Sequence, residues 1–499
     1  MTDSVLWQAL LLVLDPYVLW VILGSAMFGL FVGAVPGLTA TMATALLVPV
    51  TFFMPPVPAI ASIVTATAMA IFAGDIPSCF LRMPGTPASA AYTDEAYAMT
   101  KKGQGEVALG AGLVFSVIGG LFGTAVLIVA APALAEIALK FSSFEYFWLV
   151  MLGLLSAVFL ALGNPLKGVV SLLLGLLVSA VGLDNPAGFP RFTFGNAELA
   201  GGLTLIPIMI GMFAVSEILR SVAAIDQPWE MAQAQIGNVF RGMWTLTKRY
   251  PLQILRGSAL GTAIGALPGA GADIAAWMSY AMSKKFSRER EKFGTGHVEG
   301  IIEAGASNNS ALAGAWIPAL VFGIPGDSIT AIVIGVLYIK GLNPGPTIFM
   351  NNAVSLYAIF IVFILANLLM LPLGIAAIKS AKQMLRAPRE LLLPVILLFC
   401  IVGSFAINNT VFGVLLMLGF GVLGYLMEEN GFPVAPAILG MVLGAMLEEN
   451  FISSMIKADG SVVAFLERPI AGGLGALTLA VLSVPLVRAL MRPGSFPGK

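Results

Sequence analysis

The sequence has little charge, little cysteine and almost no histidine. Charged residues make up 10% of its 499 positions, whereas soluble domains average about 25%. The formal net charge is zero, which argues against nucleic acid as a partner because nucleic-acid-binding surfaces are basic. Cys79 and Cys400 stand far apart in apolar stretches, so no disulfide framework is expected. His297 is the single histidine and has no Cys or His companion, so no transition-metal site is expected.

Two further signals are missing. The first eight residues contain no Lys or Arg, and a cleaved signal peptide opens with a positive segment. The first apolar segment is therefore expected to be a retained membrane span. No P-loop is present, which argues against an ATP-driven pump on this chain.

What the sequence has in excess is apolar residues. They make up 58% of the chain, and the mean hydropathy is +0.95. Apolar segments of spanning length, about 20 residues, recur from end to end. We therefore expect an all-α polytopic membrane protein with roughly 10 to 12 crossings. The expected divisions are a first repeat half at 1–215, a cytoplasmic basic connector at 216–256, a broken-helix second half at 257–378 and C-terminal membrane helices at 379–499.

Basic residues are concentrated in a few segments. Ten of the 26 Lys and Arg fall between Arg220 and Lys292, and positive segments tend to face the cytoplasm. The acidic segments Glu428–Glu429 and Glu448–Glu449 are then expected to face outward. Residues 257–283 lie between two basic stretches, so both ends are expected on the cytoplasmic side. This predicts a re-entrant hairpin, and the alternative is one full span that disobeys the charge rule.

A pattern of small residues and prolines occurs twice. Residues 24–37, GSAMFGLFVGAVPG, match residues 257–269, GSALGTAIGALPG, with one gap. Residues 76–85, IPSCFLRMPG, match residues 317–326, IPALVFGIPG, and both read I-P-x6-P-G. The two elements recur in the same order at offsets of 232–233 and 241. We therefore predict an internal duplication.

Each copy thus contains two Pro-Gly breaks inside apolar sequence. Proline removes a backbone donor, and glycine permits backbone angles that other residues resist. Lipid cannot satisfy a freed N–H or C=O group, so such breaks are tolerated where water, ions or substrate use those groups. Paired breaks in two related halves are typical of a transporter's binding site. The alternative is that each Pro-Gly pair only kinks a packed helix.

Polar residues cluster at and after the breaks. A half-helix that begins there presents free N–H groups and a partial positive charge, which suits a carboxylate. Backbone carbonyls and side-chain oxygens suit a small cation, and most of the hydroxyls are expected to act as N-caps. The residues predicted to bind substrate are Arg82, Pro84, Gly85, Thr86, Ser89, Pro325, Gly326, Asp327, Ser328 and Thr330. The residues predicted to bind a coupling cation are Pro36, Gly37, Thr39, Pro268, Gly269, Gly271, Asp273, Asn308 and Asn309.

Several of these assignments have alternatives. Arg82 and Asp75 are seven residues apart, so Arg82 either pairs with Asp75 or meets a substrate carboxylate. Asn308 and Asn309 either join helices or act as ligands through their carbonyl oxygens. The aspartates after the third and fourth breaks could instead form the carboxylate pair of an intramembrane aspartyl protease, but no protease motif accompanies them. A purely structural membrane subunit is a third alternative.

Three stretches resemble the signature of a known family: VGAVPGLTATMA, GDIPSCFLRMPGTPASAAYTDEAYAMTKKGQGEVALG and NNSALAGAWIPALVFGIPG. The family is TctA, the large membrane subunit of tripartite tricarboxylate transporters, and the resemblance covers most of residues 20–350 closely. The sequence departs from the family pattern at Asp75, at Arg82 and at residues 94–97, DEAY, where Asp-Gly-Tyr would be usual.

The resemblance implies a bacterial inner-membrane permease that is not an enzyme and takes up tricarboxylates, dicarboxylates or related organic anions. It implies two partners, a small four-helix membrane subunit and a periplasmic solute-binding protein. It also implies uptake driven by a gradient of Na⁺ or H⁺, with no cofactor apart from that coupling cation.

Overall fold

The computed structural model describes residues 2–160, 164–183, 188–223, 237–385 and 389–490. These residues are almost entirely helical, with one isolated antiparallel bridge between Gly182 and Arg191 and no strand among them. The all-α prediction is confirmed.

The helices of the N-terminal part and their bounds are α1 (Thr2–Val13), α2 (Pro16–Ala34), α3 (Ala40–Phe52), α4 (Pro56–Ala73), α5 (Asp75–Leu81), the 3-10 turn η1 (Ser89–Tyr92), α6 (Thr93–Lys101), α7 (Gly105–Ala138), α8 (Ser143–Leu160), α9 (Pro165–Ser179), α10 (Ala197–Ala200), α11 (Leu205–Ile210), the π-helical turn η2 (Gly211–Val215) and α12 (Ser216–Ala223). Those that follow are α13 (Met243–Arg249), α14 (Pro251–Gly265), α15 (Gly271–Phe286), the 3-10 turn η3 (Arg290–Lys292), α16 (Val298–Phe322), α17 (Ser328–Ile339), α18 (Ile348–Asn351), α19 (Ala353–Lys379), α20 (Ala381–Met384), α21 (Arg389–Asn408), α22 (Val411–Glu429), α23 (Val434–Lys457), α24 (Ala464–Glu467) and α25 (Pro469–Leu490).

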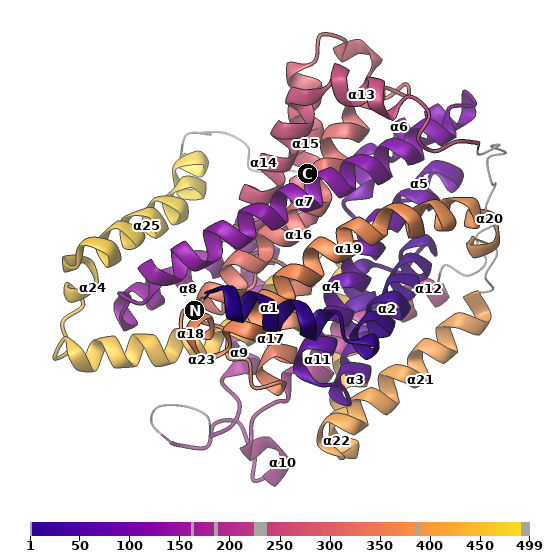
Figure 1. Ribbon diagram of the computed structural model, residues 1–499. Helices are drawn as coiled ribbons and strands as arrows, with labels where there is room; N and C mark the ends of the chain where they lie inside the picture. The colour runs from indigo at the N-terminus through magenta and orange to yellow at the C-terminus, as the bar shows by residue number, and fades with distance from the viewer. Residues whose placement is uncertain (1, 161–163, 184–187, 224–236, 386–388, 491–499) are drawn as a thin grey trace, which may run out of the picture.

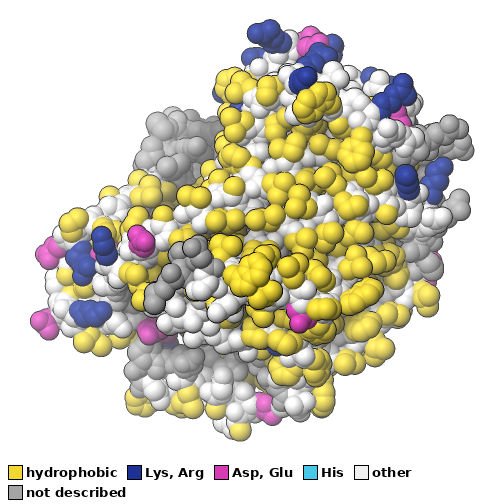
Figure 2. All heavy atoms as spheres, viewed as in Figure 1, with side chains coloured by type: hydrophobic (Ala, Val, Ile, Leu, Met, Phe, Trp, Pro, Cys, Tyr) yellow, Lys and Arg dark blue, Asp and Glu magenta, His cyan; other side chains and the backbone are white. Residues whose placement is uncertain are grey.

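Eight helical segments of the described chain are long and apolar enough to cross a membrane. They are Pro16–Ala34, Pro56–Leu81, Gly105–Ala138, Leu205–Ala223, Ala353–Lys379, Glu390–Ile407, Val411–Glu429 and Val434–Lys457. Shorter apolar helices, among them α3 and α17, supply halves of broken elements. Figure 2 shows hydrophobic side chains across the middle of one face, with Lys and Arg gathered at the end that carries α13 in Figure 1. The chain is a multi-pass membrane protein.

The first element of the repeat has the same packing in both copies. Helix α2 packs against α4, and α14 packs against α16. In each pair two glycines lie directly on backbone carbonyls of the partner helix, so that any side chain would collide with the partner. The contacts are Gly29–Ala66 and Gly33–Ala70 in the first copy and Gly261–Ser307 and Gly265–Ala311 in the second. All four pairs keep the offsets of the sequence repeat, so the duplication extends to the packing.

The second element also has the same backbone in both copies. Arg82 and Gly323, 241 positions apart, both adopt left-handed angles, with φ of 55° and 68°. Each ends its helix by donating its N–H to the carbonyl oxygen of the helix proline, Pro77 or Pro318. A left-handed residue at a helix end is a common terminator because it redirects the last orphan groups. The I-P-x6-P-G pattern therefore encodes a helix, a stop and a new start.

The two copies are oriented oppositely in the membrane. Lys340, just after α17, donates to the carbonyl oxygens of Phe52 and Met54 at the end of α3, at 2.9 and 2.8 Å. Lys102, just after α6, donates to the carbonyl oxygen of Thr295, which follows α15, at 2.6 Å. Helices α3 and α17 thus end at one face, and α6 and α15 end at the other (Figure 1). The repeat is inverted, a relation that the sequence had left undecided.

The hairpin predicted for residues 257–283 is present. Helices α14 and α15 pack together and are joined by a short break at 266–270. Their outer ends lie at one face, where the guanidinium of Arg256 lies over the ring of Phe286 at 5.2 Å. The alternative of one full span is wrong, because the glycines of the break turn the chain back toward the face from which it entered.

The opposite sides predicted for Glu428–Glu429 and for the basic segment that begins at Arg220 are incompatible. Arg220, near the end of α12, forms ion pairs with Glu428 and with Glu429, the latter at 3.8 Å. Both acidic residues therefore lie at the same face as the start of the basic segment. Helix α22 packs on η2 and α12 and ends beside them, so opposite charges meet there. At another position in the fold, Glu448 pairs with Arg191 at 2.6 Å.

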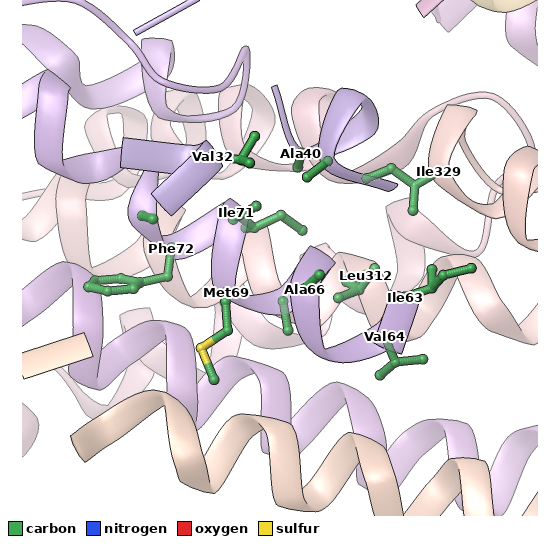
Figure 3. Close-up of a cluster of buried hydrophobic side chains, with 14 of the residues drawn as sticks. Val32, Ala40, Ile63, Val64, Ala66, Met69, Ile71, Phe72, Leu312 and Ile329 are labelled. Carbon is green, nitrogen blue, oxygen red and sulfur yellow. The ribbon is translucent and has the colours of Figure 1, made fainter. Parts of the chain in front are cut away.

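Outside the broken core, helices of the first half pack against C-terminal helices. Helices α8 and α9 pack against α23, whereas α21 and α22 pack against α3, α11 and η2. Buried hydrophobic side chains of both copies also meet in the centre, where Ile63 and Ile71 of α4 lie in one cluster with Leu312 of α16 and Ile329 of α17 (Figure 3). The domain divisions at 215, 256 and 378 stay predictions, and residues 224–236 of the connector lie outside the described chain.

Candidate substrate and ion site

A cavity of about 330 Å³ lies where the four breaks meet. Each break contributes the residues that follow its Pro-Gly pair. The contributions are Thr39, Ala40 and Thr41 from the first, Thr86, Pro87 and Ala88 from the second, Gly269 to Ile274 from the third, and Asp327, Ser328 and Ile329 from the fourth. Four positions that are far apart in the sequence thus share one space.

The start of a helical segment lies at the cavity in every case. Helices α3 and α17 begin at its wall after the N-caps Thr39 and Asp327. Thr39 accepts from the N–H of Met42 at 3.1 Å, and Asp327 accepts from the N–H of Thr330 at 2.7 Å. Helix α15 begins at Gly271, also in the wall. Because the first N–H groups of a helix lack internal partners, the wall carries partial positive charge.

The second and fourth breaks form matching caps from different side chains. The N–H of Thr86 donates to the hydroxyl of Ser89 at 3.1 Å, and the N–H of Ser89 donates to the hydroxyl of Thr86 at 3.2 Å. At the equivalent positions, Asp327 and Thr330 exchange the same two bonds at 2.9 and 2.7 Å. The expectation that hydroxyls act as caps is confirmed for these residues.

The predicted site residues fall into two groups. Those that line the cavity are Thr39, Thr86, Gly269, Gly271, Asp273, Asn308, Asp327 and Ser328. Those that do not line it are Pro36, Gly37, Arg82, Pro84, Gly85, Ser89, Pro268, Asn309, Pro325, Gly326 and Thr330. The second group shapes the breaks, and its direct contact with ligand stays a prediction.

Gly85 and Gly326 do not line the cavity but allow the backbone at the breaks to pack closely. A Cβ on Gly85 would lie 2.6 Å from Cα of Gly74 and 2.7 Å from the carbonyl oxygen of Gly33. A Cβ on Gly326 would lie 2.7 Å from Cα of Ala315 and 2.7 Å from the carbonyl oxygen of Gly265. In both copies, therefore, the second break is pressed against the helix end of the first break, and only glycine fits there.

Arg82 lies away from the cavity. Its guanidinium forms an ion pair with Asp94 at 2.9 Å, and both side chains are more than 60% exposed. The alternative pairing with Asp75 is wrong, because the left-handed turn at Arg82 directs the side chain outward, whereas Asp75 is buried in α5.

The adjacent asparagines of α16 have different environments. Asn308 lines the cavity, is 1% exposed, and its side-chain carbonyl oxygen has no hydrogen-bond partner in the described structure. Asn309 points away and donates to the carbonyl oxygen of Ala68 on α4 at 3.3 Å. The carbonyl oxygen of Asn309 also has no hydrogen-bond partner in the described structure. The two residues differ in that Asn308 lines the cavity, whereas Asn309 joins α16 to α4.

Sequence reasoning missed a charged cluster at the cavity wall. Glu217 and Arg220 of α12 line it together with Glu428 of α22. Arg220 pairs with Glu217 at 3.0 Å and with Glu428 across the two helices. No local signal marks these residues, because α12 and α22 are far apart in the sequence and pack together only in the folded chain.

Comparison with known proteins identifies the family of the chain. A family model described as the tripartite tricarboxylate transporter TctA family matches residues 18–439. The chain belongs to the TctA family. The match spans all four breaks and extends to α23, well beyond the stretch in which the resemblance was close.

Two relatives of this TctA-family chain come from Agrobacterium vitis. One is described as an uncharacterized 52.8 kDa protein in the TAR-I ttuC' 3' region and is 33% identical over 473 residues, 95% of this chain and 94% of the relative. The other is an uncharacterized protein in the TAR-II ttuC' 3' region, 33% identical over 232 residues, which are 46% of this chain and 96% of the relative. No solved structure matches the chain.

The cavity of this TctA-family protein combines groups suited to both signs of charge. The helix starts offer N–H donors to an anion. The carboxylates of Asp273 and Asp327 and the free oxygen of Asn308 are hard oxygen ligands of the kind that small cations take. One oxygen of Asp327 also accepts from Thr330 within its cap. A carboxylate in a cap can still share a proton through its other oxygen, so this geometry does not test the alternative of a protease pair.

Proposed function

We propose that the chain is the large permease subunit of an ion-gradient-driven secondary transporter for tricarboxylates, dicarboxylates or related organic anions. The substrate binds in the cavity between the inverted copies, with its carboxylates at the helix starts after Gly85 and Gly326. The convergence of all four breaks on one cavity is the observation that carries this proposal. Unused backbone breaks at membrane depth would be costly, and transporters place their substrates at such points.

The size of the cavity fits a small solute. Its volume of about 330 Å³ lies at the lower end of the range of about 300–1,000 Å³ for small-molecule sites. Hydroxyls of Thr39, Thr41, Thr86 and Ser328 line it beside the N–H groups. Such a wall recognises several carboxylates through hydrogen bonds rather than through one fixed cationic partner.

The charge in the wall supports coupling to a cation. Four carboxylates and one guanidinium line the cavity, and the guanidinium of Arg220 is engaged by Glu217 and Glu428. An organic polyanion therefore enters a space that already holds excess negative charge, and burying unpaired charge is expensive. Cations bound at Asp273, Asp327 and Asn308 would offset that charge. This arrangement makes anion binding depend on Na⁺ or H⁺.

The family supplies the expected partners. A tripartite transporter implies further subunits, and we assign a small four-helix membrane subunit and a periplasmic solute-binding protein to this chain. We place it in the inner membrane of a bacterium, with the face that carries α13 and the end of α15 in the cytoplasm because that face is rich in Lys and Arg.

Uptake into proteoliposomes tests the function. The purified complex is reconstituted and offered citrate, tartrate, C4-dicarboxylates and aromatic carboxylates, each with and without a Na⁺ or a pH gradient. We expect gradient-dependent accumulation of at least one carboxylate without ATP. The proposal fails if none accumulates above protein-free liposomes while the subunits are assembled, or if accumulation requires ATP.

A further inference from the structure

A buried carboxylate lies directly behind the cavity wall. Asp75, the first residue of α5, is 3% exposed. One of its oxygens, Oδ1, accepts from the hydroxyl of Tyr92 at 2.6 Å. The other, Oδ2, has no hydrogen-bond partner and lies against Gly112 of α7. No Lys, Arg or His of the described chain forms an ion pair with it.

The surroundings of Asp75 supply no compensating charge. On its own helix the other titratable residue is Cys79, and on η1 it is Tyr92. The ionisable residues of α6 are engaged elsewhere. Asp94 pairs with Arg82, and Lys101 lies over the ring of Tyr97. Glu95 accepts from the backbone N–H groups of Gly294, Gly296 and His297. Helix α4 has no ionisable residue, α2 has Tyr17 at its far end, and Glu106 of α7 accepts from the N–H of Gly237.

A charge in this position is expensive unless it is neutralised. An ionised carboxylate that is buried without a counter-ion loses its hydration and gains little in return. Ionisable groups retained inside membrane proteins under these conditions are typical of proton pathways. A bound proton neutralises Asp75 without any further protein group, and its release to water restores the carboxylate.

Asp75 is close enough to the cavity to sense its contents. Ile71, one helical turn earlier, lines the cavity. Gly74 packs against Thr86, another wall residue, with no room for a side chain between them. A single layer of residues therefore separates Asp75 from the ligand space.

The bond from Tyr92 to Asp75 spans the second break. Asp75 precedes Pro84-Gly85, and Tyr92 follows that pair. A second bond, from the hydroxyl of Thr93 to that of Ser78 at 3.1 Å, spans it as well. A hydrogen bond to an ionised acceptor is stronger than one to a neutral acceptor, so protonation of Asp75 would weaken the connection between the two sides of this break.

We propose that Asp75 and Tyr92 form a proton-carrying site, and that the proton bound there is a coupling ion of this transporter. The proposal deepens the proposed function and its coupling part rests on it. Proton binding at Asp75 loosens the second break and proton release tightens it, which links the charge state of Asp75 to the shape of the cavity wall at Thr86. The site is separate from the carboxylates at the third and fourth breaks.

Infrared spectroscopy tests the site without any transported substrate. The carbonyl stretch of protonated carboxylic acids is recorded on the purified chain during a pH titration. We expect wild-type protein to have a titrating band that is lost in Asp75→Asn and kept in Asp15→Asn, whose exposed side chain caps α2 equally well as an amide. Identical band profiles in wild type and Asp75→Asn would overturn the proposal. Should Asp75→Asn not fold, Tyr92→Phe must shift the pH at which the band disappears, and an unchanged titration is a negative result.

Transport tests the coupling. In proteoliposomes that accumulate citrate or another carboxylate, Asp75→Asn should lower uptake driven by a pH gradient by about tenfold or more, while exchange of internal for external carboxylate continues. Retention of full pH-gradient dependence by Asp75→Asn, or uptake by wild type that responds to Na⁺ alone, contradicts the proposal. Failure of wild type to transport any carboxylate refutes the proposed function instead, and the infrared result then stands alone.

Discussion

The two copies of the repeat have nearly the same backbone at their breaks but different side-chain chemistry. The cap after the second break is built from Thr86 and Ser89, and the equivalent cap after the fourth is built from Asp327 and Thr330. Thr67, which bonds to Thr44 at 2.9 Å, is replaced by Asn308 in the second copy. The first copy therefore presents neutral hydroxyls to the cavity, and the second presents carboxylates and an amide.

Outside the cavity the charged side chain belongs to the first copy, and the second copy has apolar residues at the equivalent positions. Asp75 and Tyr92 of the first copy correspond, at an offset of 241, to Trp316 and Val333 of the second. Trp316 packs against Phe363 in an edge-to-face contact. The first copy thus has a charge-dependent hydrogen bond across its second break, and the second copy has apolar side chains at the same two positions. Backbone geometry is constrained by the close glycine contacts in both copies, and the side chains are free to specialise.

The largest expected effect is equal in both copies. Gly85→Ala and Gly326→Ala each place a Cβ within 2.7 Å of backbone atoms, so a backbone shift must follow. We expect each variant to lose uptake by about a hundredfold or more, because wall residues move with the break. Uptake and thermal stability are measured side by side.

Gly24→Ala is the matched control for that experiment, since nothing lies within 4 Å of the added atom. Wild-type uptake by either Gly85→Ala or Gly326→Ala would show that the copies are not equivalent in packing.

The second largest effect differs between the copies, because their caps carry different side chains. Asp327→Asn keeps a good N-cap but removes a charge, so the cation concentration for half-maximal uptake should rise about tenfold, or roughly 1.4 kcal/mol. Thr86→Val in the first copy should instead raise the half-saturating concentration of the carboxylate. Initial uptake rates over both concentration ranges check this. The same change in cation dependence for both variants would contradict the difference in side-chain chemistry between the copies.

The adjacent asparagines provide a smaller contrast. Asn308→Ala should reduce uptake strongly with little change in stability, because Asn308 lines the cavity and its carbonyl oxygen has no protein partner. Asn309→Ala should lower the free energy of unfolding by about 1 kcal/mol through loss of its bond to α4. Its loss of uptake should be smaller than that of Asn308→Ala. Thermal unfolding in detergent measures the change in stability, and proteoliposomes measure the change in uptake. A larger loss of uptake in Asn309→Ala than in Asn308→Ala would place the ligand oxygen on Asn309.

The smallest effect tests the inverted relation of the copies. Lys102→Ala and Lys340→Ala each remove bonds between the end of one copy and the other copy. Both should lower stability by a similar amount, about 1 kcal/mol. Lys101→Ala serves as the control, because that ammonium lies over the ring of Tyr97 in its own helix. If only one of the two lysine variants were destabilised, the contacts of Lys102 and Lys340 would not be equivalent, which would contradict the inverted relation of the copies.

The duplication and the position of each break could be predicted from the sequence. Pro-Gly pairs act locally, so their effect on the backbone needs no knowledge of partners. The caps at Thr86 and Asp327 were predictable for the same reason. The convergence of the breaks was an inference from duplication, and the structure places Thr39, Thr86, Gly271 and Asp327 around one cavity.

Features that depend on distant partners could not be predicted. The cluster at Arg220 joins residues 208 positions apart, and the charge rule assigned Arg220 and Glu428 to opposite faces. Asn308 and Asn309 are both buried on all sides, so no periodicity distinguishes the one that faces the cavity. Arg82 could not be assigned because its direction depends on a left-handed turn that the sequence does not specify.

Substrate protection of a single cysteine tests the central claim, that the cavity between the breaks holds the carboxylate. Ser328→Cys introduces a thiol in the wall, and the native Cys79 and Cys400 are buried. The carboxylate that supports uptake should slow maleimide labelling at position 328 in proportion to its saturation of transport, and should leave labelling of Ser461→Cys, on an exposed turn, unchanged. Labelling of position 328 that stays the same at saturating substrate would contradict the account.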